Sequence, residues 1–357
     1  MSVLVLSGAD VSKLTASVSA QAVCAVLGKA MSAISNHQSS DPAIQNPQRI
    51  ATDSDYYKNL YMPSRLTTSE GSTTAIKIVG VPKPACPIPG LPATTLVFDE
   101  STGLTRAVVN AAELTGIRTA AASALASKIL ADASAGNLLV FGSGTQAYYH
   151  ARLILQLFPS IGSCTFIVRS KSSRATTVMA RLVSEFASVA FDLRTAETSS
   201  EAVKQADIIC TCVPSTAPLF KAEDLKAGVH INAIGSYTPS MQEFPPSLIS
   251  PATPSTSPSS PYIPTVLTDS TPACLAEAGE LITAQIPASH LVELGTLLDP
   301  ASGEVRRDAE TEERIGKLRE RGRSLFKCVG IGGMDVAITK LVVDEAERLG
   351  LGARVAF

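Results

Sequence analysis

Residues 137–147 read Asn-Leu-Leu-Val-Phe-Gly-Ser-Gly-Thr-Gln-Ala, a short apolar run that leads directly into two closely spaced glycines. The apolar run predicts a buried strand, and the residues after the glycines, Gln146–Leu157, predict a helix. The turn between them has the pattern G-x-G-x-x-A, in which Gly142 permits the tight turn and Gly144 lets the backbone approach a pyrophosphate, while Ala147 allows the helix to pack closely on the strand. The segment therefore predicts the dinucleotide-binding turn of a Rossmann-type domain.

The residues after the next expected strand, Cys164–Val168, indicate which dinucleotide is bound. A helix N-terminus favours phosphate binding, and an acidic residue at the end of the second strand would bind the ribose 2′-hydroxyl of NAD. Here that stretch is basic and contains no acidic residue, so its side chains could hold the 2′-phosphate of NADP. We therefore expect NADPH to be preferred, with NADH possible. The residues assigned to the cofactor site are Gly142, Ser143, Gly144, Thr145, Gln146, Arg169, Ser170, Arg174, Cys212, Val213 and Gly235.

Strands and helices alternate through the middle of the chain. An Ala- and Leu-rich stretch, Thr119–Asp132, predicts the helix that opens this region. After the glycine turn, further strands are expected at Cys164–Val168, Val189–Leu193, Ile208–Val213 and His230–Ile234. Such alternation favours a parallel sheet that is covered by helices on both faces.

A tract of serine and proline at residues 247–264 interrupts the alternation. Its composition predicts a mobile surface insertion that buries no core and continues no helix. The strand Thr265–Asp269 is expected to resume the fold after it. The first hundred residues differ from the middle, because a helical stretch, Thr15–Ile34, precedes β-rich runs at Thr74–Val79 and Thr94–Phe98.

The composition excludes several classes of protein. The 357 residues suggest two domains, and a hydrophobic content of 45% excludes global disorder. A formal net charge of −2 and the absence of tryptophan disfavour nucleic-acid binding. No apolar stretch reaches the roughly 20 residues of a membrane-spanning helix. The seven scattered cysteines predict reduced thiols with no zinc or other metal site, so we expect a soluble cytoplasmic protein.

Several ordered motifs, besides the glycine turn, resemble the ornithine cyclodeaminase/mu-crystallin family. They are Leu114-Thr-Gly-Ile-Arg118-Thr-Ala-Ala, Asn232-Ala-Ile-Gly235-Ser-Tyr-Thr-Pro239 with Gln242-Glu243, Glu277-Ala-Gly-Glu280, and Leu325-Phe-Lys-Cys-Val-Gly330 with Asp335. The resemblance covers nearly the whole chain apart from the Ser/Pro tract. It implies an α/β fold with a Rossmann-type NAD(P)-binding domain at residues 119–324. It also implies a smaller α+β domain, built from residues 1–118 and 325–357, that binds substrate and forms a homodimer.

The resemblance also implies chemistry at a carbon–nitrogen bond next to a carboxylate. Arg118 matches the arginine that binds this carboxylate, and its planar guanidinium suits both oxygens. Lys77 lies in an apolar strand, where the family places a lysine near the reacting bond; partial burial would lower its pKa and let it exchange protons. We therefore assign catalytic roles to Lys77 and Arg118. The substrate-binding residues are expected to be Arg49, Lys77, Thr94, Arg118 and Ser236, with Asp335 in a structural or supporting role.

Ser236 favours one activity within the family. The cyclodeaminases and several amino-acid dehydrogenases of the family have an aspartate here, which can bind a substrate ammonium, and a neutral serine cannot supply that charge. Ketimine reductases similar to mu-crystallin also have a small non-acidic residue. The resemblance therefore favours NAD(P)H-dependent reduction of a cyclic ketimine or α-imino carboxylate to an amino acid. An amino-acid dehydrogenase, an ornithine or lysine cyclodeaminase, and a non-catalytic NADPH-containing binding protein remain alternatives.

Overall fold

The computed structural model describes residues 2–37, 43–68, 70–87, 90–251 and 260–357. The chain forms two compact units. Unit 1 consists of Met1–Arg118, Leu298–Glu304 and Gly330–Phe357, and unit 2 consists of Thr119–Leu297 and Val305–Val329. The division falls within one helix, α3 (Ala112–Leu130).

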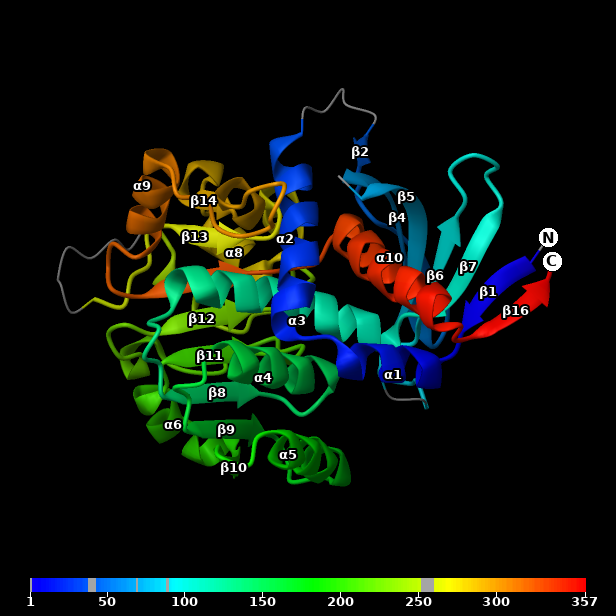
Figure 1. The fold of residues 1–357 in the computed structure, drawn as a ribbon. Helices are drawn as coiled ribbons and strands as arrows, with labels where there is room; N and C mark the ends of the chain where they lie inside the picture. Colours follow the sequence, from blue (N-terminus) through cyan, green and yellow to red (C-terminus); the bar gives the residue numbers. More distant parts are fainter. Residues whose placement is uncertain (1, 38–42, 69, 88–89, 252–259) are drawn as a thin grey trace. The chain divides into compact units, whose positions relative to one another are not determined.

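Unit 2 is built on an eight-stranded sheet in which every strand pair is parallel, as the alternation of strands and helices predicts (Figure 1). Its strands are β8 (Asn137–Phe141), β9 (Ser163–Val168), β10 (Ala190–Thr195), β11 (Ile208–Thr211), β12 (His230–Ala233), β13 (Val266–Thr268), β14 (Leu291–Glu293) and β15 (Ser324–Lys327). Its helices are α4 (Thr145–Leu157), α5 (Ser173–Glu185), α6 (Ser199–Gln205), α7 (Thr271–Glu277), α8 (Gly279–Ala284) and α9 (Ala309–Leu318). Short 3-10 turns occur at Ala196–Thr198, Ala222–Asp224, Pro246–Leu248, Ala288–His290 and Leu294–Leu297.

The strand order of this sheet reverses between β8 and β11. The order is β10–β9–β8–β11–β12–β15–β13–β14, so the chain runs outward from β8 to β10 and then crosses back to β11. In open parallel sheets, ligands commonly bind beyond the carboxyl ends of the strands at such a reversal. The predicted glycine turn leaves the sheet at this point, because it directly follows β8.

The core of unit 2 extends into both ends of the Ser/Pro tract. Leu248, Ile249 and Ile263 are fully buried in the same apolar cluster as Phe244 and Val266. The expectation that residues 247–264 bury no core is therefore wrong at both ends, because apolar side chains at the ends of the tract fill space beside the sheet. Residues 252–259 lie outside the described residues.

Unit 1 contains a second eight-stranded sheet, which is mixed. Its order is β16–β1–β7–β6–β5–β4–β2, and β3 also pairs with β4. The strands are β1 (Ser2–Leu6), β2 (Ile44–Gln45), β3 (Ile50–Asp53), β4 (Tyr57–Thr68), β5 (Gly71–Pro82), β6 (Ala93–Phe98), β7 (Thr105–Asn110) and β16 (Ala353–Ala356). The two ends of the chain pair with each other, because β1 and β16 are antiparallel neighbours (Figure 1).

Helices of unit 1 come from both ends of the chain. They are α1 (Gly8–Ser17), α2 (Ala20–Asn36) and α10 (Gly332–Leu349). The sequence predicts continuous helix over Thr15–Ile34, but the chain breaks between α1 and α2, where the Ser19 side chain caps α2 by accepting from the Ala22 N–H. No single helix among the described residues is long and apolar enough to cross a membrane; α1 and α2 meet that criterion only together, with a bend of 103° between them.

The observed division between the units differs slightly from the boundary that the resemblance implies. Residue 325 lies inside β15, which pairs with β12 and β13 in the sheet of unit 2. Unit 2 therefore continues to Val329. A strand in the middle of a sheet cannot be divided between two units without breaking its hydrogen bonds, which explains the shift.

Replacement of Leu248 by alanine tests whether the Ser/Pro tract contributes to the core. Removal of a fully buried leucine side chain is expected to lower the free energy of unfolding by about 2–5 kcal/mol, measured by urea denaturation. The neighbouring Ser247→Ala is the control, and because Ser247 is exposed it is expected to change stability by less than about 0.5 kcal/mol. Equal stability of the two variants would show that the tract does not contribute to the core.

Candidate active site

Lys77 lies on the buried face of β5. Alternate residues of this strand, Ala75, Lys77 and Val79, point into unit 1, and only 2% of Lys77 is exposed. Its ammonium is 2.7 Å from Oδ2 of Asp335, which lies in the first turn of α10. A buried ammonium needs such a partner, because removal of the charge from water is otherwise strongly unfavourable.

The surroundings of Lys77 make it a better proton donor than an ordinary lysine. Burial lowers the pKa of Lys77 from 10.5 to about 8. The carboxylate of Asp335 opposes this shift, whereas the positive charges of Arg118 and Arg49 add to it. An acid with a pKa near the working pH transfers its proton efficiently, so Lys77 is suited to general acid–base chemistry.

Arg118 binds the same carboxylate as Lys77. Its Nε donates to Oδ1 of Asp335 at 3.1 Å, and only 5% of the residue is exposed. The expected position just ahead of a helix beginning at Thr119 is wrong, because α3 begins at Ala112 and includes Arg118. Gly330 lies against the guanidinium, and a Cβ atom at that position would overlap with it.

Two buried cations, Lys77 and Arg118, share one carboxylate. Asp335 contacts both of them, and the positive charge of Arg49 also acts on Lys77. The supporting role expected for Asp335 is therefore that of a shared partner that fixes both cations. A site with more cations than carboxylates attracts an anionic ligand, and arginine suits a carboxylate in particular.

The structure does not bring Thr94 into this cluster. Thr95, not Thr94, pairs directly with Lys77 across β5 and β6. Neighbouring residues in a strand point to opposite faces, so Thr94 faces away from Lys77 and is exposed, and its role as a substrate ligand remains a prediction. Thr95 is 1% exposed, and its hydroxyl oxygen has no hydrogen-bond partner among the described residues.

The glycine turn of unit 2 has the geometry that a dinucleotide requires. Gly142 has a φ of +112°, and a Cβ atom there would meet the side chain of Val213 at 2.9 Å. Gly144 caps α4 without a side chain, and a Cβ atom at Gly144 would meet nothing within 4 Å. The open space and the first-turn N–H groups of α4 therefore fit a pyrophosphate.

The other predicted cofactor residues lie around the same edge of the sheet. Arg169, Ser170 and Arg174 follow β9 and are exposed. Cys212 and Val213 follow β11, the strand on the other side of the reversal in strand order. In the turn itself, Ser143 and Thr145 flank Gly144, and the Gln146 amide donates to the Thr119 hydroxyl at 3.3 Å. These positions remain predictions for cofactor binding.

Ser236 directs its side chain into a buried network of unit 2. Its hydroxyl donates to Oε2 of Glu280 at 2.8 Å and is 3.1 Å from the carbonyl oxygen of Met241. The role of Ser236 as a substrate ligand remains a prediction, because its observed contacts are with the protein. The network also includes Glu243 and Lys327. Both lie in motifs that resemble the family, but the sequence alone indicated no role for them.

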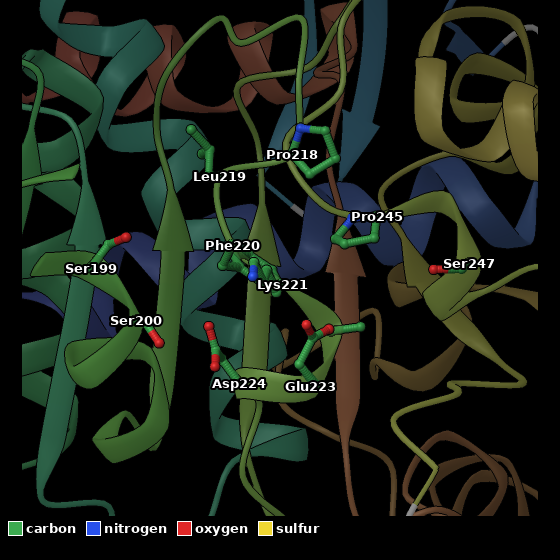
Figure 2. Close-up of a pocket in the computed structure, with 11 residues that line it drawn as sticks. Ser199, Ser200, Pro218, Leu219, Phe220, Lys221, Glu223, Asp224, Pro245 and Ser247 are labelled. Carbon is green, nitrogen blue, oxygen red and sulfur yellow. The ribbon is translucent and has the colours of Figure 1, made fainter. Parts of the chain in front are cut away.

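A hollow of about 470 Å³ lies elsewhere on unit 2 (Figure 2). Ser199 and Ser200 of α6 line it together with Lys221, Glu223 and Asp224 near the next 3-10 turn. None of the residues predicted to bind substrate or cofactor lines this hollow. The charges around it are of both signs, so they indicate no preference for an anion or a cation.

Comparisons with known proteins identify the family of this chain. The model of the ornithine cyclodeaminase/mu-crystallin family matches residues 8–255. A Δ1-pyrroline-2-carboxylate reductase of Bacillus cereus is 30% identical over 263 residues, which are 73% of each chain. The ketimine reductase mu-crystallin of Mus musculus is 30% identical over 259 residues, 72% of this chain and 71% of that one.

A solved structure supports the fold over the whole chain. The Δ1-pyrroline-2-carboxylate reductase of Thermococcus litoralis, in complex with NADH and L-proline, has a TM-score of 0.78. The similarity covers 99% of this chain and 100% of that chain, at 23% sequence identity. From the matched family model and the two 30% identical relatives, we conclude that this chain belongs to the ornithine cyclodeaminase/mu-crystallin family.

Proposed function

We propose that this protein is an oxidoreductase that uses NAD(P)H to reduce a C=N bond next to a carboxylate, which converts an imino acid to an amino acid. One observation carries the proposal: Asp335 binds both a buried lysine with a lowered pKa and a buried arginine. This arrangement supplies a proton donor and a carboxylate-binding cation together. Two relatives, named Δ1-pyrroline-2-carboxylate reductase and ketimine reductase, act on substrates of this class.

Each residue of the cluster has a distinct role in the proposed reaction. Arg118, assisted by the charge of Arg49, binds the substrate carboxylate and thereby orients the C=N bond. Lys77 donates a proton to the imine nitrogen, and Asp335 keeps the ammonium of Lys77 in place. When bound, the nicotinamide supplies a hydride to the imine carbon. The proton and the hydride together convert the imine to an amine.

The residues of unit 2 would hold the cofactor. The open space at Gly144 and the N-terminus of α4 suit the pyrophosphate. We further propose that NADPH is preferred over NADH, because Arg169 and Arg174 are exposed beside the end of β9 and no acidic residue lies there. The protein supplies binding, orientation and charge, and the cofactor supplies the reducing chemistry.

A substrate screen tests the proposed reaction. We expect five- or six-membered cyclic ketimines with a carboxylate to cause a steady loss of NADPH absorbance at 340 nm. The screen also tests the oxidative direction, in which ornithine, lysine and alanine are each incubated with NADP or NAD. Turnover of these amino acids alone would indicate a cyclodeaminase or an amino-acid dehydrogenase, and nucleotide binding without any turnover would indicate a binding protein.

The pH dependence of the reaction tests Lys77. Because Lys77 must be protonated to donate, kcat/KM for imine reduction is expected to fall as the pH rises through about 8. Asp335 raises the pKa of Lys77, so Asp335→Asn is expected to move this fall to lower pH. Lys77→Met is expected to lower kcat at least about 100-fold. A pH profile that is the same in the wild-type protein and in Asp335→Asn would contradict the role of Lys77.

Arg118→Ala tests the binding of the substrate carboxylate. We expect kcat/KM to fall at least about 100-fold with little change in the Kd of NADPH, because the lost contact is with substrate. Arg106→Ala is the matched control, since Arg106 is also a unit 1 arginine and pairs with the carboxylates of Asp344 and Glu347. A similar loss in both variants would mean that Arg118 serves only stability.

The preference for NADPH is tested by fluorescence titration of both nucleotides. The wild-type protein is expected to bind NADPH more tightly than NADH, and the double variant Arg169→Ala/Arg174→Ala is expected to lose that difference. Arg194→Ala serves as the control, because Arg194 is an arginine of the next strand, β10, and pairs with Asp192. Equal Kd values of the wild-type protein for the two nucleotides would refute the preference.

The resemblance to the family also supports the proposal that the protein is a homodimer. We also propose a cytoplasmic location, because the seven cysteines form no disulfide with one another. A monomeric mass in sedimentation velocity would contradict the proposed dimer.

A further inference from the structure

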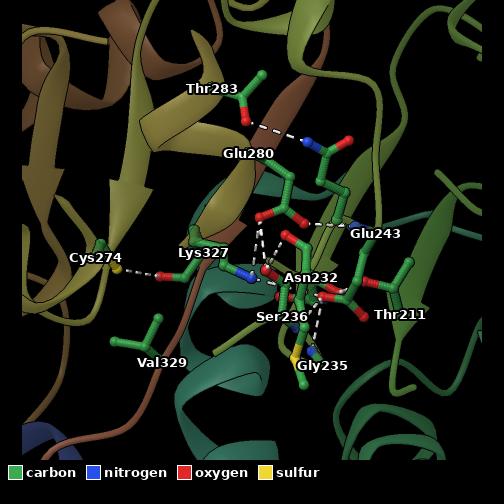
Figure 3. Close-up of polar contacts among 12 residues, drawn as sticks. Thr211, Asn232, Gly235, Ser236, Glu243, Cys274, Glu280, Thr283, Lys327 and Val329 are labelled. Carbon is green, nitrogen blue, oxygen red and sulfur yellow. Dashed lines mark hydrogen bonds and ion pairs between the residues drawn. The ribbon is translucent and has the colours of Figure 1, made fainter. Parts of the chain in front are cut away.

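Three ionisable side chains are completely buried together in unit 2 (Figure 3). Glu243 lies in the segment that follows β12, Glu280 lies in α8, and Lys327 is the last residue of β15. The ammonium of Lys327 is 3.5 Å from Oε2 of Glu243 and 3.8 Å from Oε2 of Glu280. Charged side chains are rarely fully buried unless they are paired, because their desolvation is costly.

The two carboxylates hold the turn that follows β12. Oε2 of Glu243 accepts from the backbone N–H of Gly235 at 2.7 Å and from that of Ser236 at 2.9 Å. Glu280 in turn accepts from the backbone N–H of Glu243 at 2.5 Å and from the Ser236 hydroxyl at 2.8 Å. The backbone N–H groups of Gly235 and Ser236 therefore both point at the Glu243 carboxylate. Glu280 and the Lys327 ammonium lie beside Glu243 and orient it (Figure 3).

The same turn is closely packed on its other side. A Cβ atom at Gly235 would overlap with the backbone carbonyl of Val213 and would lie 2.5 Å from Oε1 of Glu243. The Gly235 peptide is therefore held between the end of β11 and the carboxylate of Glu243. Since Gly235 and Val213 are both proposed to contact the cofactor, a displacement of Glu243 would move the cofactor site.

The charge of this network changes near neutral pH. Burial raises the pKa of Glu243 from 4.5 to about 7, and the nearby carboxylate of Glu280 adds to this rise. The Lys327 ammonium opposes the rise, as do the hydrogen bonds from the Ser236 backbone and the Thr211 side chain. The Cys212 thiol also lies near Glu243, and Cys274 and Asp269 lie near Lys327.

We propose that Glu243 is a positioning residue, oriented by Glu280 and Lys327, that fixes the Gly235–Ser236 turn at the carboxyl end of β12 and thereby sets the geometry of the cofactor site. This inference rests on the proposed function for its effect on turnover. Its effect on the turn itself does not depend on the reaction.

The folded state is expected to become less stable as the pH rises. A group whose pKa is raised by folding stabilises the folded state fully below its unfolded value, and this contribution is lost as the pH rises through the folded value. For Glu243 this loss of stability is expected between about pH 4.5 and about pH 7. Glu243→Gln resembles the protonated acid and keeps an oxygen acceptor, so it is expected to hold the turn without this pH dependence.

The experiment compares Glu243→Ala, Glu243→Gln and a matched control. Asp207→Ala is the control, because the Asp207 carboxylate also pairs with a lysine, Lys226, and accepts from two consecutive backbone N–H groups, those of Gly136 and Asn137. Those residues lie at the amino ends of β8 and β11, the opposite edge of the sheet. Amide exchange of a peptide that spans residues 235–236, the Kd of NADPH, and kcat are measured from pH 5.5 to 8.5.

Glu243→Ala is expected to accelerate amide exchange at 235–236 at least about 10-fold, to weaken NADPH binding at least about 5-fold and to lower kcat at least about 10-fold at pH 6. Glu243→Gln is expected to keep all three values within about twofold of the wild type at pH 6, and its Tm is expected to lack the decline between about pH 4.5 and 7 that Glu243 causes. Asp207→Ala is expected to lower the Tm without these local effects.

Equal exchange at 235–236 and equal NADPH affinity in the wild type and Glu243→Ala would overturn the inference. Should Glu243→Ala fail to fold, a pH profile of Tm that is unchanged in Glu243→Gln would overturn it instead. If the wild-type protein reduces no imine, the proposed function fails, whereas the exchange and binding measurements still decide the role of Glu243.

Discussion

The carboxylate of Asp335 is the interaction on which the proposed chemistry depends. One of its oxygens contacts the ammonium of Lys77 and the other accepts from the guanidinium of Arg118, and all three side chains are buried. A single carboxylate cannot neutralise both cations, so the cluster keeps an excess of positive charge that an anionic substrate can satisfy. The same carboxylate limits how far burial lowers the pKa of Lys77, which leaves that lysine protonated at neutral pH but able to donate.

Unit 2 uses buried charge for a different purpose. Ligands of open parallel sheets commonly bind where the strand order reverses, as it does here between β8 and β11, and the backbone turns at the strand ends must be held still for a ligand to bind in one orientation. Glu243 binds two peptide N–H groups at the end of β12 and is itself held by Glu280 and Lys327. The two units thus contain two buried sets of carboxylates and cations, one proposed to bind substrate and one proposed to hold the backbone of the cofactor site.

Much of the fold could be predicted from local sequence patterns. The glycine turn and the alternation of strands and helices depend on neighbouring residues, so they predict the parallel sheet of unit 2 correctly. Register and tertiary partners depend on distant residues. The sequence did not predict that Thr95, and not Thr94, would lie beside Lys77, because a shift of one residue in a strand reverses the face of the sheet.

The candidate site was partly predictable for the same reason. Lys77 stands out as a charged residue in an apolar strand, and Arg118 lies in a motif, but the bond from Arg118 to Asp335 joins residues 217 positions apart. Composition also misleads where a few apolar residues lie in a polar tract, as Leu248, Ile249 and Ile263 do. Glu243, Glu280 and Lys327 were missed because charged side chains are usually exposed, and nothing local indicates that these three are buried together.

The most direct test of the central claim follows a labelled hydride. The protein is given a cyclic ketimine carboxylate with NADPH that carries deuterium at the transferable position of C4, and the product is analysed by mass spectrometry and NMR. The account predicts an amino acid with one deuterium on the α-carbon, the position to which the hydride is transferred. An amino acid without deuterium on that carbon, or recovery of the imine unchanged, would contradict it.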